Sequence, residues 1–329
     1  MRHSRYTIAG LRSYFGTVAV LWVLGAGLGL LYARHKEFSL SWTVAVLPAL
    51  LLEIALYAAA GFPSVLAWLQ GLTGKTSLLL VLSAVAPYLV LSLALGTFEV
   101  RHLATLATLA SGAVFWRRLL PKHPVSDLLF LAFAASVYAS KTFTVIYENP
   151  AQRPPLDILG RLMWIRLLVS AVRLSASQTP EFGFVPAARQ WRTGFFYYIC
   201  ALPPVLLLSF ALGVVHQPAP WTLRTPLLTV ATFLGFLWVV GLAEEFFFRG
   251  MLQPILEQMT GHSWAGLALT SVIFGLAHLG FRQFPNWRFA LVAAICGVFY
   301  GLAYSKAKSV LAAAVTHALV VTTWRVFFV

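Results

Sequence analysis

Charged residues are scarce in this 329-residue sequence, in which Asp, Glu, Lys and Arg together make up 10% of the chain. A soluble domain has about 25% of such residues. Hydrophobic residues make up 60% of the chain, and its mean hydropathy is +0.81. A water-soluble core cannot bury that much apolar surface, so the composition excludes an ordinary soluble globular protein.

Cysteines and acidic residues are also few. The two cysteines, Cys200 and Cys296, fall inside apolar runs, so no disulfide framework is expected. The 24 basic residues outnumber the 10 acidic ones, but they are scattered singly or in pairs between the apolar runs. This distribution is typical of membrane loops that face lipid headgroups. Without a basic cluster interleaved with aromatics, no nucleic-acid partner is predicted.

Long apolar runs, in contrast, occur throughout the chain. A helix needs about 20 apolar residues to cross a bilayer, and lipid offers no partners for free backbone groups. The continuous runs therefore predict an all-α, polytopic transmembrane bundle with about 8–10 spans. The predicted spans are 15–32, 42–60, 77–96, 103–115 (short), 125–140, 195–215, 226–248, 264–281, 289–307 and 310–328.

The chain divides into three parts by composition. Residues 1–140 are predicted N-terminal transmembrane helices, and residues 195–329 form a second set of spans. Residues 141–194 are less apolar and contain breakers such as Pro154-Pro155, so they are read as a junction. Within this junction, 156–174 places three arginines among leucines, which indicates an amphipathic helix in the headgroup plane or a partly spanning one.

One carboxylate lies deep in an apolar run of the first part. Glu53 follows Leu51 and Leu52 and precedes Ile54. An ionisable group at this depth is a functional candidate, although a helix-packing or snorkelling role is the expected one.

A second acidic site lies at the end of the run 226–248. Glu244 and Glu245 are adjacent, and Arg249 follows one helical turn later. Glu245 and Arg249 stand at i and i+4 on one helix face, the favourable order for an ion pair, whereas Glu244 points about 100° away. One carboxylate is therefore predicted to be neutralised and structural, and the other to be free.

Two histidines in apolar segments can serve the free carboxylate: His278 and His317. A carboxylate, an imidazole and an enclosed water suffice to generate a nucleophile by general-base catalysis. A second imidazole can donate a hydrogen bond to the developing oxyanion. Such a hydrolytic site needs no Ser or Cys nucleophile and no cofactor.

Simpler roles exist for each residue taken alone. A Glu-Glu pair at a helix end is more often a solvated interfacial cluster, and a single His in an apolar helix is more often a packing residue. His278 and His317 could also bind a metal together with Glu244, although the His-Glu-x-x-His pattern is absent.

The order and spacing of the motifs is more specific than any one of them. Glu-Glu-x-x-x-Arg over 244–249 is followed by Phe-x-x-x-His over 274–278 and by His317 in the last span. Over roughly residues 195–328, this arrangement resembles the CPBP family of intramembrane proteases (CAAX protease and bacteriocin-processing, also called the ABI family). The neighbouring residues Arg249-Gly250, His278-Leu279 and 301–319 agree with the resemblance.

The resemblance implies a glutamic-type endopeptidase in an all-helical bundle. By that analogy Glu244 is the general base, His278 holds and activates the water, and His317 stabilises the oxyanion. Glu245 and Arg249 then order the first motif.

One position departs from the family pattern, which commonly has Asn or Asp four residues after the last His. This chain has Val321 there, followed by Thr322 and Thr323. Either an oxyanion donor is missing, or a Thr hydroxyl or a neighbouring helix replaces it. The loss of one such donor can cost about 10²-fold or more in rate.

We therefore expect an integral, multi-pass protein of the plasma or inner membrane that hydrolyses a peptide bond in a membrane-associated or lipidated protein or peptide. Its partners are this substrate and the lipid bilayer. Two other functions stay open: a catalytically weak or inactive scaffold or chaperone of the same fold, which Val321 makes possible, and a transporter with Glu53 and Glu244 as charge carriers.

Overall fold

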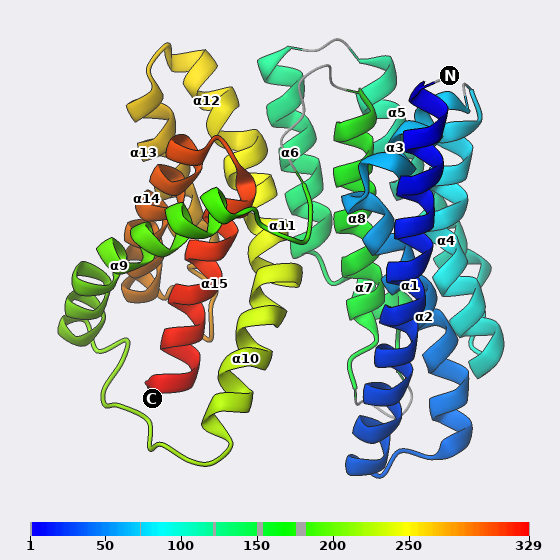
Figure 1. Cartoon of the computed structure of the whole chain (residues 1–329), viewed down its shortest axis with the longest axis horizontal. Helices are drawn as coiled ribbons and strands as arrows, with labels where there is room; N and C mark the ends of the chain where they lie inside the picture. The colour runs from blue at the N-terminus through cyan, green and yellow to red at the C-terminus, as the bar shows by residue number, and fades with distance from the viewer. Residues whose placement is uncertain (1, 73, 121–122, 150–153, 176–181, 329) are drawn as a thin grey trace. The chain divides into compact units, whose positions relative to one another are not determined.

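The chain folds into two compact units, Met1–Thr179 and Pro180–Val329, each built from packed helices (Figure 1). The computed structural model describes residues 2–72, 74–120, 123–149, 154–175 and 182–328, with side chains from residue 9 onward. Within these residues there is no strand, and the one isolated bridge joins Pro218 and Phe328. The predicted all-α, polytopic class is confirmed.

Seven helices among the described residues are long and apolar enough to cross a membrane. They are Ala9–His35, Leu40–Gly61, Lys75–Leu95, Ala188–Ala211, Thr225–Thr260, Trp287–Ala307 and Val310–Phe327. Pro124–Ala139 and Ser263–Ala277 are apolar but shorter. The predicted span 103–115 lies within α5, which is not among the seven.

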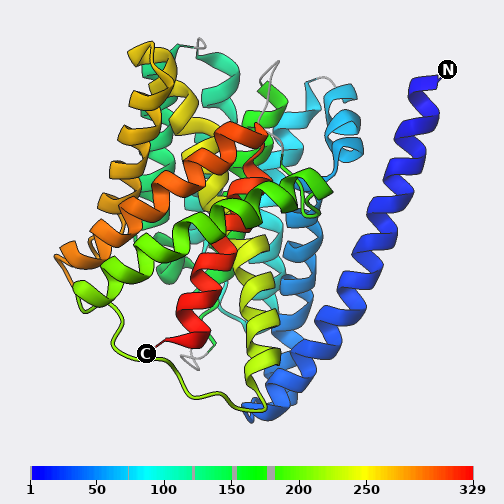
Figure 2. The same ribbon diagram turned by 60° about the vertical axis from the view of Figure 1, so that its left-hand side comes forward.

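The first unit contains helices α1 to α8. Their bounds are α1 Arg2–His35, α2 Leu40–Gly61, α3 Pro63–Gly71, α4 Lys75–Leu95, α5 Val100–Leu119, α6 Pro124–Ala139, α7 Thr142–Ile146 and α8 Asp157–Ser175. Helix α1 runs along the edge of this unit, where it packs against α2 and α3 (Figure 2).

Helix α8 lies at the centre of the first unit rather than on its surface. It packs against α2, α4 and α5, and its residues Met163, Trp164 and Leu167 have no exposed surface. An amphipathic helix in the headgroup plane keeps one face toward water. The interfacial position considered for residues 156–174 therefore does not fit this burial.

Arg166 explains why a helix with three arginines can be buried. Its guanidinium binds both carboxylate oxygens of Glu53, with Nε 2.7 Å from Oε1 and Nη2 3.1 Å from Oε2. Nη1 and Nη2 also donate to the hydroxyl and the carbonyl oxygen of Ser83 on α4, at 3.0 and 2.7 Å. Glu53 thus has the charged partner that its sequence did not reveal, and the pair holds α2, α4 and α8 together.

The second unit contains α9 Ala188–Ala211, α13 Ser263–Ala277, α14 Trp287–Ala307, α15 Val310–Phe327 and one long helix from Thr225 to Thr260. The long helix passes through α10 Thr225–Gly235, η1 Phe236–Gly241, α11 Leu242–Glu245, η2 Phe246–Leu252 and α12 Gln253–Thr260, where η1 and η2 are π-helical. The predicted span 226–248 is therefore the first two thirds of a longer helix.

Helix α15 is the most deeply buried of the seven long apolar helices and packs against α9, α10 and α14. Its start is fixed by Ser309, whose hydroxyl accepts a hydrogen bond from the backbone N–H of Leu311. Gly194 on α9 permits a close approach, because a Cβ added there would lie 2.6 Å from Cγ1 of Val315. Small residues at such contacts let helices pack backbone to backbone.

Candidate active site

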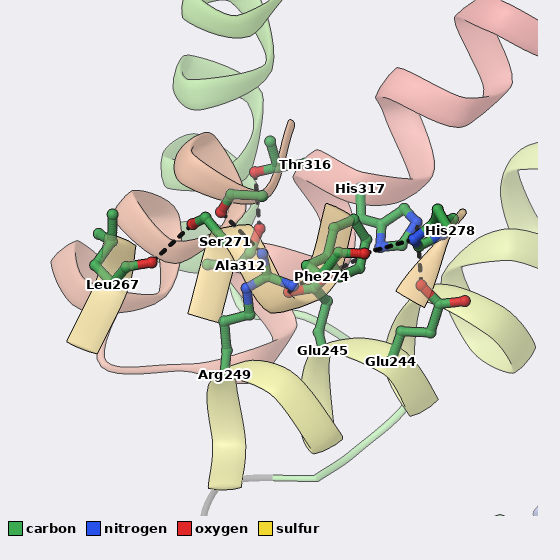
Figure 3. A network of polar contacts seen from close by, with 11 residues as sticks. Glu244, Glu245, Arg249, Leu267, Ser271, Phe274, His278, Ala312, Thr316 and His317 are labelled. Atoms are coloured by element: carbon green, nitrogen blue, oxygen red, sulfur yellow. Dashed lines mark hydrogen bonds and ion pairs between the residues drawn. The ribbon is translucent and has the colours of Figure 1, made fainter. Parts of the chain in front are cut away.

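The two adjacent glutamates lie on a four-residue α-helical segment between two π-helical stretches. Helix α11 spans Leu242–Glu245, and η1 and η2 flank it directly. Short π-helical stretches inside α-helices occur frequently at functional sites. Glu244 and Glu245 point from this helix toward His317 on α15, and Arg249 contacts Glu245 (Figure 3).

Glu245 and Arg249 form the predicted i, i+4 ion pair, and neither side chain has exposed surface. Nη1 of Arg249 lies 3.2 Å from both carboxylate oxygens of Glu245. Nη2 donates to the carbonyl oxygen of Gly297 on α14 at 2.8 Å. A Cβ at position 297 would lie 3.2 Å from Nη2, so a larger residue would crowd this contact. The ion pair thus connects the long helix to α14.

His317 is held by the same glutamate. Its Nδ1 lies 2.8 Å from Oε1 of Glu245. A carboxylate accepts, so Nδ1–H is the donor, and Nε2 is left to face the rest of the site. Nε2 lies 4.0 Å from Oε2 of Glu244. Glu245 therefore fixes the orientation of the imidazole that faces Glu244.

Glu244 is the less constrained of the two carboxylates. Its side chain is 32% exposed, but its Oε2 atom is buried and has no hydrogen-bond partner among the described residues. Buried polar atoms without a partner are rare and call for an explanation, of which a catalytic role is one. The prediction that one glutamate is paired and the other free matches this geometry.

His278 ends α13 as its C-cap residue rather than lying inside a span. Its Nδ1 lies 2.7 Å from the carbonyl oxygen of Phe274, which can only accept, so Nδ1 carries the hydrogen. In the neutral ring, Nε2 is then an acceptor. No hydrogen bond or ion pair joins His278 to Glu244 in the described part of the chain, where the imidazole nearest to Glu244 belongs to His317.

Both histidines line one cavity in the second unit, which contains about 660 Å³ of space including its open mouth. Its other lining residues are mainly aliphatic and aromatic side chains from α9, α14 and α15, and Val321 is among them. The polar members are Ser209, His278, Cys296, Tyr300, His317 and Thr323. An apolar group can therefore lie beside the two imidazoles.

A metal-binding arrangement was one of the alternatives for Glu244, His278 and His317. Among the described residues, no three His, Cys, Asp or Glu side chains are grouped so that they could hold a metal ion. The site instead consists of an ion pair, a carboxylate-bound imidazole and a carboxylate with a free oxygen.

Comparison with known families gives a match over residues 225–323, whose family is described as "Type II CAAX prenyl endopeptidase Rce1-like". Residues 225–323 are therefore similar to this family, and we call them the Rce1-like segment. This family is a branch of the CPBP proteases, which is the family that the motifs resembled. The recognition of the family from the sequence is therefore confirmed. A protease-type fold and, at the level of class, hydrolase chemistry follow from the match. No curated protein and no solved structure matches the chain.

The Rce1-like segment contains all five residues that the sequence singled out, from Glu244 to His317. It is narrower than the predicted region of resemblance at 195–328, because it begins at α10. The cavity extends beyond it, since Leu202, Val205 and Leu206 on α9 form part of the wall. Helix α9 thus contributes to the site from outside the Rce1-like segment.

Sequence reasoning missed the aromatic residues that surround His317 in the Rce1-like segment. The ring of Tyr300 stacks on the imidazole, with centroids 4.6 Å apart and an interplanar angle of 12°. Phe274 meets the imidazole edge-on, with its centroid 5.9 Å away. Only Phe274 could have been selected from the sequence, because it is the first residue of the Phe-x-x-x-His motif. Tyr300 belongs to no motif that would have selected it.

Proposed function

We propose that the chain is an intramembrane glutamic-type endopeptidase that hydrolyses a peptide bond in a membrane-associated or lipidated protein or peptide. One observation carries the proposal: the buried Oε2 of Glu244 accepts no hydrogen bond from the described residues and lies 4.0 Å from Nε2 of His317, whose other nitrogen is bound to Glu245. The Rce1-like match supports the protease class. The apolar cavity beside both histidines supports a substrate with apolar groups near the scissile bond.

Glu244 acts as the general base in this proposal. Its free oxygen removes a proton from water, the water oxygen bonds to the carbonyl carbon, and the carbonyl electron pair moves to the oxygen. When the C–N bond breaks, Glu244 returns the proton to the leaving nitrogen. The carboxylate is suited to this task because its Oε2 atom accepts no hydrogen bond from the residues that the structure describes.

The two histidines flank this reaction in the proposal. His278 holds the water through Nε2, which its bond to Phe274 leaves free as an acceptor in the neutral ring. His317 lies nearest to Glu244 and stabilises the oxyanion through Nε2 when both ring nitrogens carry hydrogen, because Nδ1 stays on Glu245. Glu245 and Arg249 keep His317 in place.

A catalytically inactive scaffold is the second candidate, and Val321 favours it. This valine lines the cavity one helical turn after His317, where it offers no hydrogen-bond donor. A transporter has less support, because Arg166 already neutralises Glu53 and all of the charged oxygens in that pair are bonded.

The test uses the purified full-length chain in nanodiscs with a library of membrane-tethered peptides, with products identified by mass spectrometry. We expect wild-type cleavage that persists with a chelator and is lost in Glu244→Ala and His278→Ala. Loss on chelation would replace the glutamic mechanism with a metal-dependent one. Binding of peptides without cleavage, alike in wild type and variants, would favour the scaffold.

A further inference from the structure

On the cavity wall formed by α15, residues 321–323 offer no free donor to the cavity. Val321 is apolar, and the hydroxyl of Thr323 donates to the carbonyl oxygen of Leu319 at 2.9 Å and lies 2.8 Å from the hydroxyl of Tyr198. Thr322 is not part of the lining. Apart from the indole N–H of Trp324, a second donor for an oxyanion must therefore come from another helix.

Tyr300 on α14 meets this requirement by position. It lines the same cavity and is only 1% exposed. Its ring stacks on His317 almost in parallel, with 4.6 Å between the centroids.

The ring of Tyr300 is held on several sides. Phe274 meets it edge-on with centroids 5.8 Å apart, and the guanidinium of Arg249 lies 5.4 Å from its centroid. A donor that is fixed before the reaction stabilises a developing charge without reorganising in the transition state. The packing around Tyr300 provides this rigidity.

The neighbour of Tyr300 on the cavity wall is a thiol. Cys296 lies one turn earlier on α14 and lines the same cavity. A thiol sulfur is a poor hydrogen-bond acceptor compared with an oxyanion. A charged oxygen beside Tyr300 is therefore the better acceptor for its O–H.

We propose that the hydroxyl of Tyr300 is a second oxyanion donor for this hydrolysis, in addition to His317; the inference rests on the proposed function. As the water oxygen bonds to the carbonyl carbon and Glu244 takes the proton, the carbonyl oxygen gains the electron pair. Tyr300 donates its O–H to that oxygen and keeps its proton throughout. Collapse of the intermediate restores the C=O bond, breaks the C–N bond, and transfers the proton from Glu244 to the amine.

The first test is Tyr300→Phe, which keeps the ring and the stack and removes only the hydroxyl. We expect kcat to fall by about 10²–10³-fold, the usual loss for one oxyanion donor, with KM changed only a few-fold. Tyr304→Phe is the matched control, because Tyr304 lies one turn later on α14 and is outside the cavity lining. Its kcat should equal that of the wild type.

Rescue separates a chemical role from a packing role. In the Tyr300→Phe background, Val321→Asn places an amide donor on the cavity wall and should recover at least tenfold in kcat. An unchanged kcat in Tyr300→Phe would overturn the proposal. So would a loss of kcat that accompanies a lower Tm and that Val321→Asn does not recover.

The variant Glu244→Gln separates a failure of the proposed mechanism from a failure of the role assigned to Tyr300. If Glu244→Gln cleaves peptides at the wild-type rate, the proposed glutamic mechanism is wrong, and the role of Tyr300 is wrong with it. If Glu244→Gln is inactive and Tyr300→Phe is fully active, only the assignment of Tyr300 is wrong.

Discussion

Nδ1 of His317 lies 2.8 Å from Oε1 of Glu245, and these side chains are only 5% and 0% exposed. The same carboxylate neutralises Arg249, so one glutamate holds an imidazole and a guanidinium at once. Oε2 of the neighbouring Glu244 has no hydrogen-bond partner among the described residues and lies 4.0 Å from Nε2 of His317. Two adjacent residues of the same type thus have different structural tasks, and their substitution should have different consequences.

Substitution of Glu245 should lower the free energy of unfolding of the second unit more than substitution of Glu244 does. In Glu245→Ala the buried Arg249 loses its counter-charge, which costs about 3–5 kcal/mol. In Glu244→Ala a partly exposed carboxylate is lost, and the change should stay within about 0.5 kcal/mol. Thermal unfolding in detergent, followed by tryptophan fluorescence, measures both. Equal decreases in Tm would contradict the division of tasks.

The buried pair in the first unit should show the behaviour of a desolvated ion pair. Glu53→Leu leaves Arg166 uncompensated and should cost about 3–5 kcal/mol, whereas Glu53→Leu with Arg166→Met should be much closer to the wild type. A double-mutant cycle of unfolding free energies gives the coupling between them. If the double variant is as unstable as the sum of the single variants, the pair is not the contact that holds α2, α4 and α8.

Gly194 should be intolerant of alanine, unlike Gly235. A Cβ at position 194 would lie 2.6 Å from Cγ1 of Val315 and 2.8 Å from the carbonyl oxygen of Ala312, so α9 and α15 must move apart. We expect a loss of about 1–3 kcal/mol. Gly235 has nothing within 4 Å of that position, and Gly235→Ala should be neutral or stabilising by up to about 1 kcal/mol. Thermal unfolding measures the Tm of both variants. Similar Tm values would show that Gly194 does not limit how closely α9 packs against α15.

Filling the cavity should weaken substrate binding more than it lowers the rate at saturation. Ala293 lines the cavity and is 6% exposed, so Ala293→Phe should raise KM for a membrane-tethered peptide at least several-fold. Leu291→Phe is the control, since Leu291 lies on the same helix and is 43% exposed. Steady-state kinetics of both variants provide the measurement. An unchanged KM in Ala293→Phe would show that the substrate binds elsewhere.

Local patterns in the sequence predicted the features that depend on residues close together in the chain. The apolar runs indicated a helical membrane bundle, and the i, i+4 spacing of Glu245 and Arg249 indicated their ion pair, because both depend on near neighbours in the chain. The partner of Glu53 could not be found this way, since Arg166 lies 113 residues away and meets it only through the packing of three helices. The burial of α8 was missed for the same reason.

In the candidate site, too, the contacts between residues far apart in the sequence could not be predicted. Motif spacing selected Glu244, His278 and His317 as candidates, but it could not predict which imidazole faces which carboxylate. The structure places His317 beside Glu244, because α11 packs against α15, whereas His278 ends the separate helix α13. The stack of Tyr300 on His317 likewise depends on the position of α14, which no spacing along the chain encodes.

The central claim is that Glu244 is the base in a peptide hydrolysis, and single-turnover cleavage of a membrane-tethered peptide by Glu244→Gln tests it most directly. Glu257→Gln is the matched control, because Glu257 belongs to α12 and binds Gln253 at 2.9 Å outside the cavity. Since a general base contributes about 10²–10⁴-fold, we predict at least a 10²-fold slower rate in Glu244→Gln with the peptide still bound, and a wild-type rate in Glu257→Gln. A wild-type rate in Glu244→Gln would contradict the account.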